Sequence, residues 1–233
     1  MASQNGEPAE LTNGSSKGES GRGLLKERAY AEIKRGILSG KLAAGSFLAE
    51  RQLAAQLGMS KTPVRSALER LESEGLLSIS PQQGAIIRDL AVPEIADQYE
   101  IRMAIESFVV RTLAGKLSPS QIDLVRANLE AQQANLGAGG DVASGVTLDE
   151  EFHALFCEFL GNQEILRVMG QLRDKTHRVI FRVFSINPER MARSYEEHRD
   201  IAEAVFQGEP ALAATRIEDH LRIGMRSLLP SRS

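Results

Sequence analysis

Residues 49–71, AERQLAAQLGMSKTPVRSALERL, restrict the possible fold more than any other stretch of this chain. Read with a helical period, they give two short amphipathic helices separated by Gly58, a residue that can end a helix in the left-handed conformation. Ser60 is then placed to cap the second helix, and Pro63 falls in its first turn, where a missing N–H does little harm. The spacing predicts either a helix-turn-helix or an ordinary helical hairpin.

The second of these helices carries cationic and hydroxyl side chains near its exposed N-terminal end. They are Lys61, Thr62 and Arg65. A DNA-binding helix-turn-helix inserts this end of its recognition helix into the major groove, where such side chains meet bases and phosphates. The arrangement is typical of a recognition helix, while the ordinary hairpin stays open as the alternative at this point.

The flanking segments favour DNA binding. Residues 77–80 and 85–88 are expected to form two short strands joined by a tight turn that ends in Gly84. A hairpin directly after a recognition helix is a wing, whose tip can reach the adjacent minor groove or backbone. Apolar residues at helical spacing within 27–42 predict a further helix that packs behind the other two.

The stretch from about residue 24 to residue 90 resembles the winged-helix domain of the GntR superfamily of bacterial transcription regulators. The most diagnostic pieces are Gly40-x4-Gly45, Glu50-Arg51-x-Leu53-Ala54 and the run from Lys61 to Leu71. We therefore expect residues 23–90 to be the DNA-binding domain. The resemblance implies a set of DNA-contacting residues on the helices and at the wing tip: Arg51, Lys61, Thr62, Arg65, Gln83 and Gly84.

Two positions depart from the family pattern. Ala49 stands where a capping serine is usual, so the first helix of the pair lacks a side-chain acceptor worth roughly 1 kcal/mol. Lys61 replaces a more usual arginine, which exchanges the bidentate geometry that suits guanine for a point charge. The departure at Lys61 affects base preference rather than the expectation of DNA binding.

Charge is divided unevenly between the two parts of the chain. The net charge of the whole chain is −3. Residues 23–90 hold ten Lys and Arg against seven Asp and Glu, a net of +3, whereas residues 91–233 hold sixteen against twenty-one, a net of −5. Attraction to backbone phosphates needs a basic surface, so the DNA-binding surface is expected in the first part.

The remaining composition indicates a cytoplasmic protein. Residues 1–22 are rich in Gly, Ser, Asn and Glu, which predicts a disordered tail, and they contain no apolar segment of the kind found in signal peptides. No apolar run approaches the length of a membrane span. The single cysteine, Cys157, lies in an apolar stretch and is expected to be a core residue in a reducing compartment.

Strand patterns disappear after residues 89–93, so the chain is expected to be mainly α: a winged helix-turn-helix followed by an all-helical bundle in residues 91–233. Glycine and proline divide this region into about six helices. Their expected ranges are 94–115, 119–136, 146–160, 163–185, 188–207 and 210–229. A bundle of this length can enclose a ligand cavity.

Three histidines lie on apolar faces of three different predicted helices. Asp149 and His153 are four residues apart and share one face, while His198 and His220 each fall within an apolar stripe. Three nitrogens and one carboxylate oxygen suit a divalent ion such as Zn²⁺, with Ni²⁺ or Mn²⁺ as alternatives. Periodicity alone also allows each histidine to be an ordinary core residue.

The region from about residue 95 to 228 resembles the all-helical FCD effector domain of the FadR subfamily, in the group that resembles VanR. The resemblance rests on EIRMAIE, on D-x3-H at Asp149 and on EEHRDIAEAV and DHL, which contain His198 and His220. It implies that Asp149, His153, His198 and His220 bind a metal ion together. It also implies a small carboxylic acid as effector. One half-site per winged helix is too little contact for typical operator affinity, so a two-fold homodimer is expected, with its interface in the helical domain.

Arg102 is the first candidate for holding that effector. It shares a helix face with Tyr99 and Glu106, so its guanidinium is expected to be partly buried and to need an anionic partner. That partner is either the effector carboxylate or Glu106 at i+4. His177 and Arg178 are weaker candidates for the same pocket.

Two other classes of protein fit the sequence less well. A di-metal helical-bundle enzyme needs two Glu-x-x-His motifs, whereas only Glu150 and His153 form one, and an architectural DNA-binding protein needs no inward histidines. We therefore expect a regulator rather than an enzyme: a ligand-responsive transcription regulator, acting as a repressor, that binds an inverted-repeat operator in double-stranded DNA as a dimer.

Overall fold

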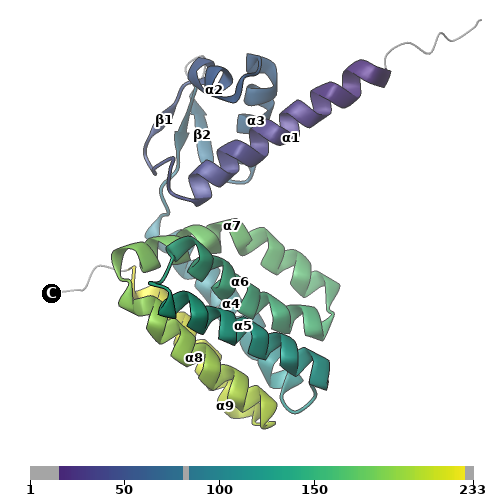
Figure 1. Ribbon diagram of the computed structural model, residues 1–233, viewed down its shortest axis with the longest axis vertical. Helices are drawn as coiled ribbons and strands as arrows, with labels where there is room; N and C mark the ends of the chain where they lie inside the picture. Colours follow the sequence, from purple (N-terminus) through teal and green to yellow (C-terminus); the bar gives the residue numbers. More distant parts are fainter. Residues whose placement is uncertain (1–15, 81–83, 229–233) are drawn as a thin grey trace, which may run out of the picture. The chain divides into compact units, whose positions relative to one another are not determined.

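The computed structural model describes residues 16–80 and 84–228 and forms two compact units (Figure 1). The first unit contains the described residues up to Ile37 together with Ala43–Arg88, and the second contains Leu38–Leu42 and the described residues from Asp89 onward. Within the described residues, every helix is too short or too polar to cross a membrane.

The first unit consists of three helices and a small sheet. Its elements are α1 (Ser16–Leu38), β1 (Phe47–Leu48), α2 (Glu50–Leu57), α3 (Lys61–Ser73), β2 (Leu77–Ser80) and β3 (Gly84–Ile87). Helix α1 differs from the expected 27–42, because it begins at Ser16 and ends at Leu38. Residues 16–22, which were predicted to be disordered, therefore belong to a helix, and Gly40 follows the helix with a φ of 70°.

Helices α2 and α3 form the predicted helix-turn-helix. Gly58 has a φ of 64° and ends α2, and Val64 on the inner face of α3 is fully buried. Ser60 occupies the N-cap position of α3, but its side chain makes no cap hydrogen bond, so the predicted side-chain cap is wrong. Its backbone is extended there, which starts the helix without the side-chain contact. Ala49 likewise caps α2 without a side-chain bond, as expected.

The sheet has the order β1-β3-β2, with both pairs antiparallel. Strand β1 is only two residues long and was not predicted, because so short a strand has no recognisable pattern. Leu48 pairs with Ala85, and the neighbouring Gly84 is buried with a φ of 139°. A Cβ atom at Gly84 would lie 2.1 Å from the Leu48 carbonyl oxygen, so only glycine fits where these strands meet.

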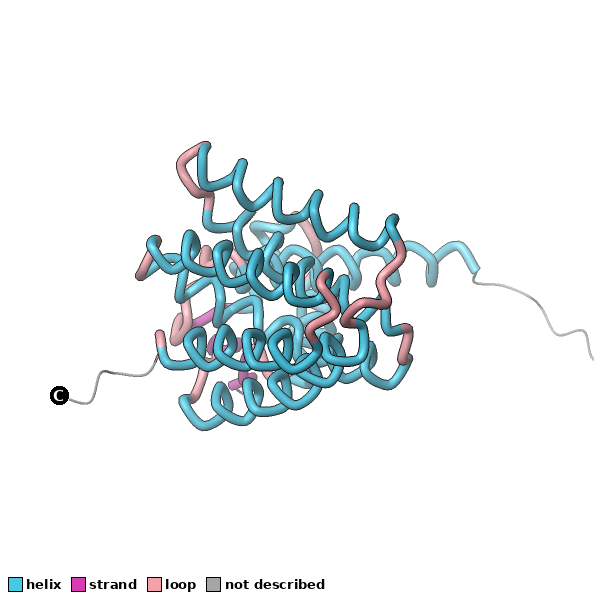
Figure 2. Tube along the Cα trace, turned by 90° about the horizontal axis from the view of Figure 1, so that it is seen from below, coloured by secondary structure: helices cyan, strands magenta, loops and turns pink. Residues whose placement is uncertain are grey.

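The second unit is a bundle of six helices within the described residues, as predicted. They are α4 (Val92–Leu113), α5 (Pro119–Gly137), α6 (Val142–Leu160), α7 (Gln163–Ile186), α8 (Glu189–Phe206) and α9 (Pro210–Arg226). Short loops connect them (Figure 2). Helix α6 begins four residues earlier than the predicted residue 146, because the Asp141 carboxylate accepts a hydrogen bond from the Ser144 N–H and caps the helix.

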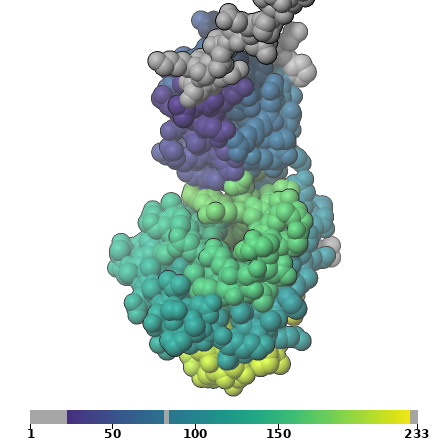
Figure 3. Space-filling view, turned by 90° about the vertical axis from the view of Figure 1, so that its right-hand side faces the viewer, coloured from purple at the N-terminus to yellow at the C-terminus, as the bar shows by residue number. Residues whose placement is uncertain are grey.

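The bundle packs around a large apolar core and a second, smaller apolar cluster. Helix α4 lies along α9, α6 lies between α5 and α7, and α8 contacts both α5 and α9. Figure 3 shows one face of this unit, on which teal and green residues form most of the surface. Phe152, Ile201 and Ile217 in the core are at most 1% exposed. Polar side chains are buried beside this core, and they form the candidate site.

Replacing Gly84 by alanine should destabilise the first unit by about 2–5 kcal/mol, because it adds backbone strain and a clash with Leu48. Urea denaturation of the full chain measures the loss. Gly58→Ala is the matched control: Gly58 also has a positive φ, but no atom lies within 4 Å of an added Cβ, so we expect a loss of about 1 kcal/mol. Equal losses at the two positions would contradict the steric account of Gly84.

Candidate functional site

The structure brings four buried side chains together in the centre of the helical bundle. Asp149 and His153 come from α6, His198 from α8 and His220 from α9. None of the four is more than 6% exposed. One possible ligand atom from each residue can be chosen so that all four atoms lie within 4.8 Å of one another. The helical spacing of the sequence predicted that these side chains face the core, and the folded bundle brings them close together.

The Nε2 atoms of the histidines and the carboxylate face this point. His153 Nε2 lies 3.2 Å from His220 Nε2 and 3.8 Å from Asp149 Oδ2. His198 Nε2 lies 3.6 Å from Asp149 Oδ1. Ser194, one turn before His198 on α8, donates a hydrogen bond of 3.0 Å to Asp149 Oδ1 and orients the carboxylate.

Each imidazole is also held from outside through its Nδ1 atom. The three contacts are His153 Nδ1 with Glu106 Oε2 at 2.5 Å, His198 Nδ1 with Gln132 Oε1 at 3.0 Å, and His220 Nδ1 with Glu197 Oε2 at 2.6 Å. Such outer contacts fix the ring orientation and tautomer of metal-binding histidines and leave Nε2 for the metal. The cluster therefore has the arrangement of side chains that could hold a metal ion.

His198 supplies the test of whether a metal fits. Its Nε2 atom is buried and has no hydrogen-bond partner within the described residues. An unsatisfied buried polar atom costs about 1–3 kcal/mol, which a metal ion at the centre of the cluster would recover. Phe152 stacks on the same ring with centroids 4.1 Å apart, so part of the surroundings of His198 is apolar.

Burial also favours the neutral form of His198 and His220, which is the form of imidazole that binds metals. It lowers the pKa of His198 well below its usual value, and the neighbouring His220 and His153 add to the effect. Burial lowers the pKa of His220 as well, although Glu197 opposes the shift. Neutral imidazoles have a lone pair to donate, so no proton has to leave these two rings before a metal binds. Three imidazoles and one carboxylate match the ligand types of zinc.

Arg102 forms the ion pair with Glu106 that was one of its two predicted partners. The Arg102 Nε atom lies 2.7 Å from Glu106 Oε1, and both side chains are 3% exposed. Burial alone would raise the pKa of Glu106, but Arg102 and His153 outweigh it and hold that pKa at about 2. Glu106 is therefore ionised and joins Arg102 to His153 of the cluster.

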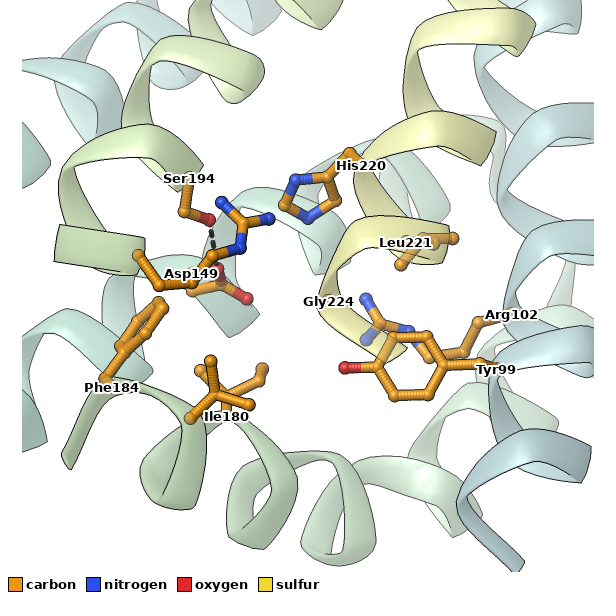
Figure 4. A pocket seen from close by; sticks show the side chains of 11 residues that line it. Tyr99, Arg102, Asp149, Ile180, Phe184, Ser194, His220, Leu221 and Gly224 are labelled. Atoms are coloured by element: carbon orange, nitrogen blue, oxygen red, sulfur yellow. Dashed lines mark hydrogen bonds between the residues drawn. The ribbon is translucent and has the colours of Figure 1, made fainter. Parts of the chain in front are cut away.

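A small cavity adjoins the cluster (Figure 4). Its polar lining consists of Tyr99, Arg102, Asp149, Arg190, Ser194 and His220. Burial raises the pKa of Tyr99 to about 12, so its hydroxyl is protonated and can donate a hydrogen bond. Two of the predicted effector-binding residues, Tyr99 and Arg102, thus line one cavity beside the candidate metal centre.

The other two predicted effector-binding residues, His177 and Arg178, do not line this cavity. Helix α7 instead presents Ile180, Val183 and Phe184 to it. His177 Nδ1 contacts Glu150 Oε2 of α6 at 3.1 Å, so this histidine of α7 forms a polar contact with α6 instead.

Several residues of the site were not predicted from the sequence. Gln132, Ser194, Arg190 and Glu197 hold or surround the cluster. Glu197 directly precedes His198 in the chain, but it contacts His220, so proximity in sequence would have suggested the wrong partner. Gln132 lies on α5, 66 residues before His198, and its polar side chain on a helix carries no signal of its role.

On the first unit, the predicted DNA-contacting residues of α2 and α3 are exposed. They are Arg51, Lys61, Thr62 and Arg65. Arg65 donates Nε to Glu50 Oε1 at 3.0 Å and Nη2 to Glu50 Oε2 at 2.9 Å. These hydrogen bonds lower the pKa of Glu50. Gly84 is buried against β1, and Gln83 lies outside the described residues.

Comparison with known families identifies both parts of the chain. Residues 25–87 match the family described as bacterial regulatory proteins, gntR family, and residues 97–223 match the FCD domain. An uncharacterized HTH-type transcriptional regulator in an unstable DNA locus of Streptomyces ambofaciens is 30% identical over 197 residues, which are 83% of this chain and 80% of that protein. The "Probable D-xylose utilization operon transcriptional repressor" of Paenarthrobacter nicotinovorans is 30% identical over 185 residues, 79% of this chain and 80% of that protein.

Solved structures share the fold. Escherichia coli McbR/YncC superposes with a TM-score of 0.72 at 22% identity, covering 87% of this chain and 95% of that chain. A transcriptional regulator GntR from Rhodococcus sp. RHA1 superposes with a TM-score of 0.77 at 18% identity, covering 89% and 99%. The chain therefore belongs to the gntR family of bacterial regulatory proteins, with an FCD domain as its second part, and is a DNA-binding transcription regulator rather than an enzyme.

Proposed function

We propose that this regulator binds an inverted-repeat operator as a homodimer and represses transcription, and that a small carboxylic acid beside a divalent metal ion modulates the binding. The observation that carries the proposal is the buried cluster of Asp149 and three histidines next to a cavity lined by Arg102. In this cluster His198 Nε2 has no hydrogen-bond partner within the described residues. Two relatives support repression by name: the D-xylose operon protein and E. coli RspR, which is 25% identical over 199 residues.

Asp149, His153, His198 and His220 would hold the metal. Zinc fits the donor set best, and nickel or manganese are alternatives. A bound divalent ion supplies positive charge that attracts a carboxylate oxygen. Asp149 and His220 belong both to the cluster and to the cavity wall, so the effector and the metal would share these two residues.

Arg102 and Tyr99 would hold the effector from the α4 side of the cavity. The guanidinium of Arg102 attracts a carboxylate, and the protonated hydroxyl of Tyr99 can donate a hydrogen bond to it. An effector that contacts α4 together with the cluster residues on α6 and α9 would change the packing of these helices. Helix α4 begins at Val92, a few residues after strand β3 ends at Ile87. Coupling of about 1–3 kcal/mol between the effector and DNA would suffice for regulation.

Arg65 is the residue that we propose reads a base. Its ion pair with Glu50 occupies the edge of the guanidinium formed by Nε and Nη2. The opposite end of the group, formed by N–H bonds of Nη1 and Nη2, can still donate to O6 and N7 of guanine. Glu50 would thus hold Arg65 in one orientation, while Lys61 and Arg51 contact DNA as exposed charges.

An exposed apolar surface supports the dimer. Phe108 and Ile101 lie seven residues apart on α4 and are 52% and 43% exposed. Leu212 and Ile223 are exposed on α9, the helix that packs along α4. Exposed apolar groups on adjacent helices are typical of a protein interface, and we propose that this surface forms the dimer.

Arg65→Ala should weaken binding to the operator by about 1–3 kcal/mol and relax the preference at one base pair, because it removes a bidentate base contact. Fluorescence anisotropy with the operator and with single-base variants measures both effects. Arg193→Ala, which removes an exposed arginine of α8, should change neither. If Arg65→Ala weakens binding to all sequences equally, Arg65 contacts only phosphate.

Phe108→Glu should dissociate the dimer, because it places a charge in the proposed apolar interface. Sedimentation velocity at micromolar concentration measures the assembly state. Leu124→Glu is the matched control, since Leu124 is 53% exposed on α5 and lies outside the proposed surface. A wild-type monomer, or a Phe108→Glu protein that stays dimeric, would contradict this interface.

His198→Ala and His220→Ala should lose the metal and the response to the effector, because each removes a ligand, while operator binding by the first unit persists. Native mass spectrometry reports the metal content, and anisotropy reports DNA binding. His177→Ala should keep the metal, because His177 contacts Glu150 outside the cluster. Full metal occupancy in His198→Ala would show that the cluster is not the metal site.

A further inference from the structure

A groove on the first unit lies between α1 and α3. It has a volume of about 420 Å³ and is lined by Lys26 of α1 and by Lys61, Thr62, Arg65, Ser66 and Glu69 of α3. Three of these side chains are cationic and one is anionic, so the lining carries a net positive charge. Lys61, Thr62 and Arg65 are among the DNA-contacting residues that the sequence predicted, whereas Lys26 belongs to a helix outside the helix-turn-helix.

Contacts directly beside the groove hold α1 against α3. Arg70 Nη1 donates to Glu27 Oε1 at 3.0 Å, and the guanidinium of Arg70 lies over the ring of Tyr30, 3.7 Å from its centroid. The Tyr30 hydroxyl donates to Glu74 Oε1 at 2.9 Å. Because Glu27 directly follows Lys26 in the chain, these contacts fix the position of Lys26 on α1 relative to the recognition helix.

Two lysines of the groove are not neutralised by the protein itself. Lys26 and Lys61 are exposed, and neither forms an ion pair within the described residues. Arg65, by contrast, is paired with Glu50. Glu69 is the one acidic residue of the lining, and it lies two turns after the start of α3. An anion in the groove is therefore attracted by a lysine on each wall, Lys26 on α1 and Lys61 on α3.

A phosphate of the DNA backbone is the anion that this groove suits. The chain is a DNA-binding regulator, and a recognition helix that enters the major groove lies between two phosphate backbones. A lysine ammonium is a compact point charge, which suits a phosphate better than the bidentate edge of a base. The hydroxyls of Thr62 and Ser66 on the same groove can donate to phosphate oxygens.

We infer that Lys26 is a DNA-binding residue that contacts a backbone phosphate beside the major groove, so that α1 takes part in DNA binding together with the helix-turn-helix. The phosphate lies between Lys26 on one wall and Lys61 with Thr62 on the other. Such a contact positions the recognition helix on the duplex and carries no base preference. It requires neither the metal ion nor the effector, so it is independent of the proposed regulation.

The salt dependence of DNA binding tests this role, because each contact with a phosphate releases counterions. Fluorescence anisotropy of the full chain is measured with two short duplexes: one that the wild-type protein selects from a random library, and one of unrelated sequence. Between about 50 and 200 mM salt, Lys26→Gln should reduce the slope of log affinity against log salt by about 0.9 for each bound chain. The affinity should fall by the same factor on both duplexes, because the lost contact is not to a base.

Lys116→Gln is the matched control. Lys116 is also an exposed lysine, but it belongs to the second unit, so its replacement removes the same charge and leaves the groove intact. This variant should keep the wild-type slope and affinity. Lys26→Arg preserves the charge and should keep the slope as well. Since Lys26 is exposed, neither of its replacements disturbs the core.

Three outcomes would overturn the assignment of Lys26 to a phosphate. An unchanged slope in Lys26→Gln would show that no phosphate pairs with this residue. An equal reduction in Lys116→Gln would show that the overall charge, and not the groove, determines the slope. A loss confined to the selected duplex would show that Lys26 reads a base instead.

Discussion

The arrangement of the helical bundle depends on the hydrogen bonds that the Nδ1 atoms of the three clustered histidines make with side chains around the cluster. Burying three histidines and an aspartate in an apolar core is unfavourable unless each polar atom has a partner. Glu106 of α4, Gln132 of α5 and Glu197 of α8 supply partners for the Nδ1 atoms, so five of the six helices, α4, α5, α6, α8 and α9, meet at one polar centre. The apolar core determines how closely these helices pack, whereas this centre determines which side chains face one another.

The same hydrogen bonds connect the centre with the cavity. Glu106 and Glu197 each contact one histidine and one arginine, and both arginines line the cavity. A ligand that contacts Arg102 or Arg190 therefore acts on groups that share a carboxylate with the proposed metal ligands. In a buried network of this kind, the displacement of one member changes the partners of the others. We regard this shared network as the physical basis for the proposed response to an effector.

Local pattern predicted much of the fold and the inner part of the site, because both depend on spacing along the chain. Helical periodicity predicted that the histidines face the core, and the positions of glycine and proline predicted the division of the bundle into six helices. The two-residue strand β1 and the unbonded cap at Ser60 were missed, since each depends on contacts made only after the chain has folded. The partners Gln132, Glu197 and Arg190 were missed for the same reason. Their contacts with the cluster exist only after helices α5, α8 and α9 have packed together.

X-ray absorption at the zinc K edge of the zinc-loaded full chain tests the central claim most directly, because it reports the atoms that surround the ion. The account predicts a four-ligand sphere with three imidazole nitrogens and one oxygen at about 2.0–2.2 Å. A sulfur neighbour at about 2.3 Å would point to Cys157 instead, and fewer than three imidazoles would show that the histidine cluster does not hold the metal. Either of these results would contradict the account.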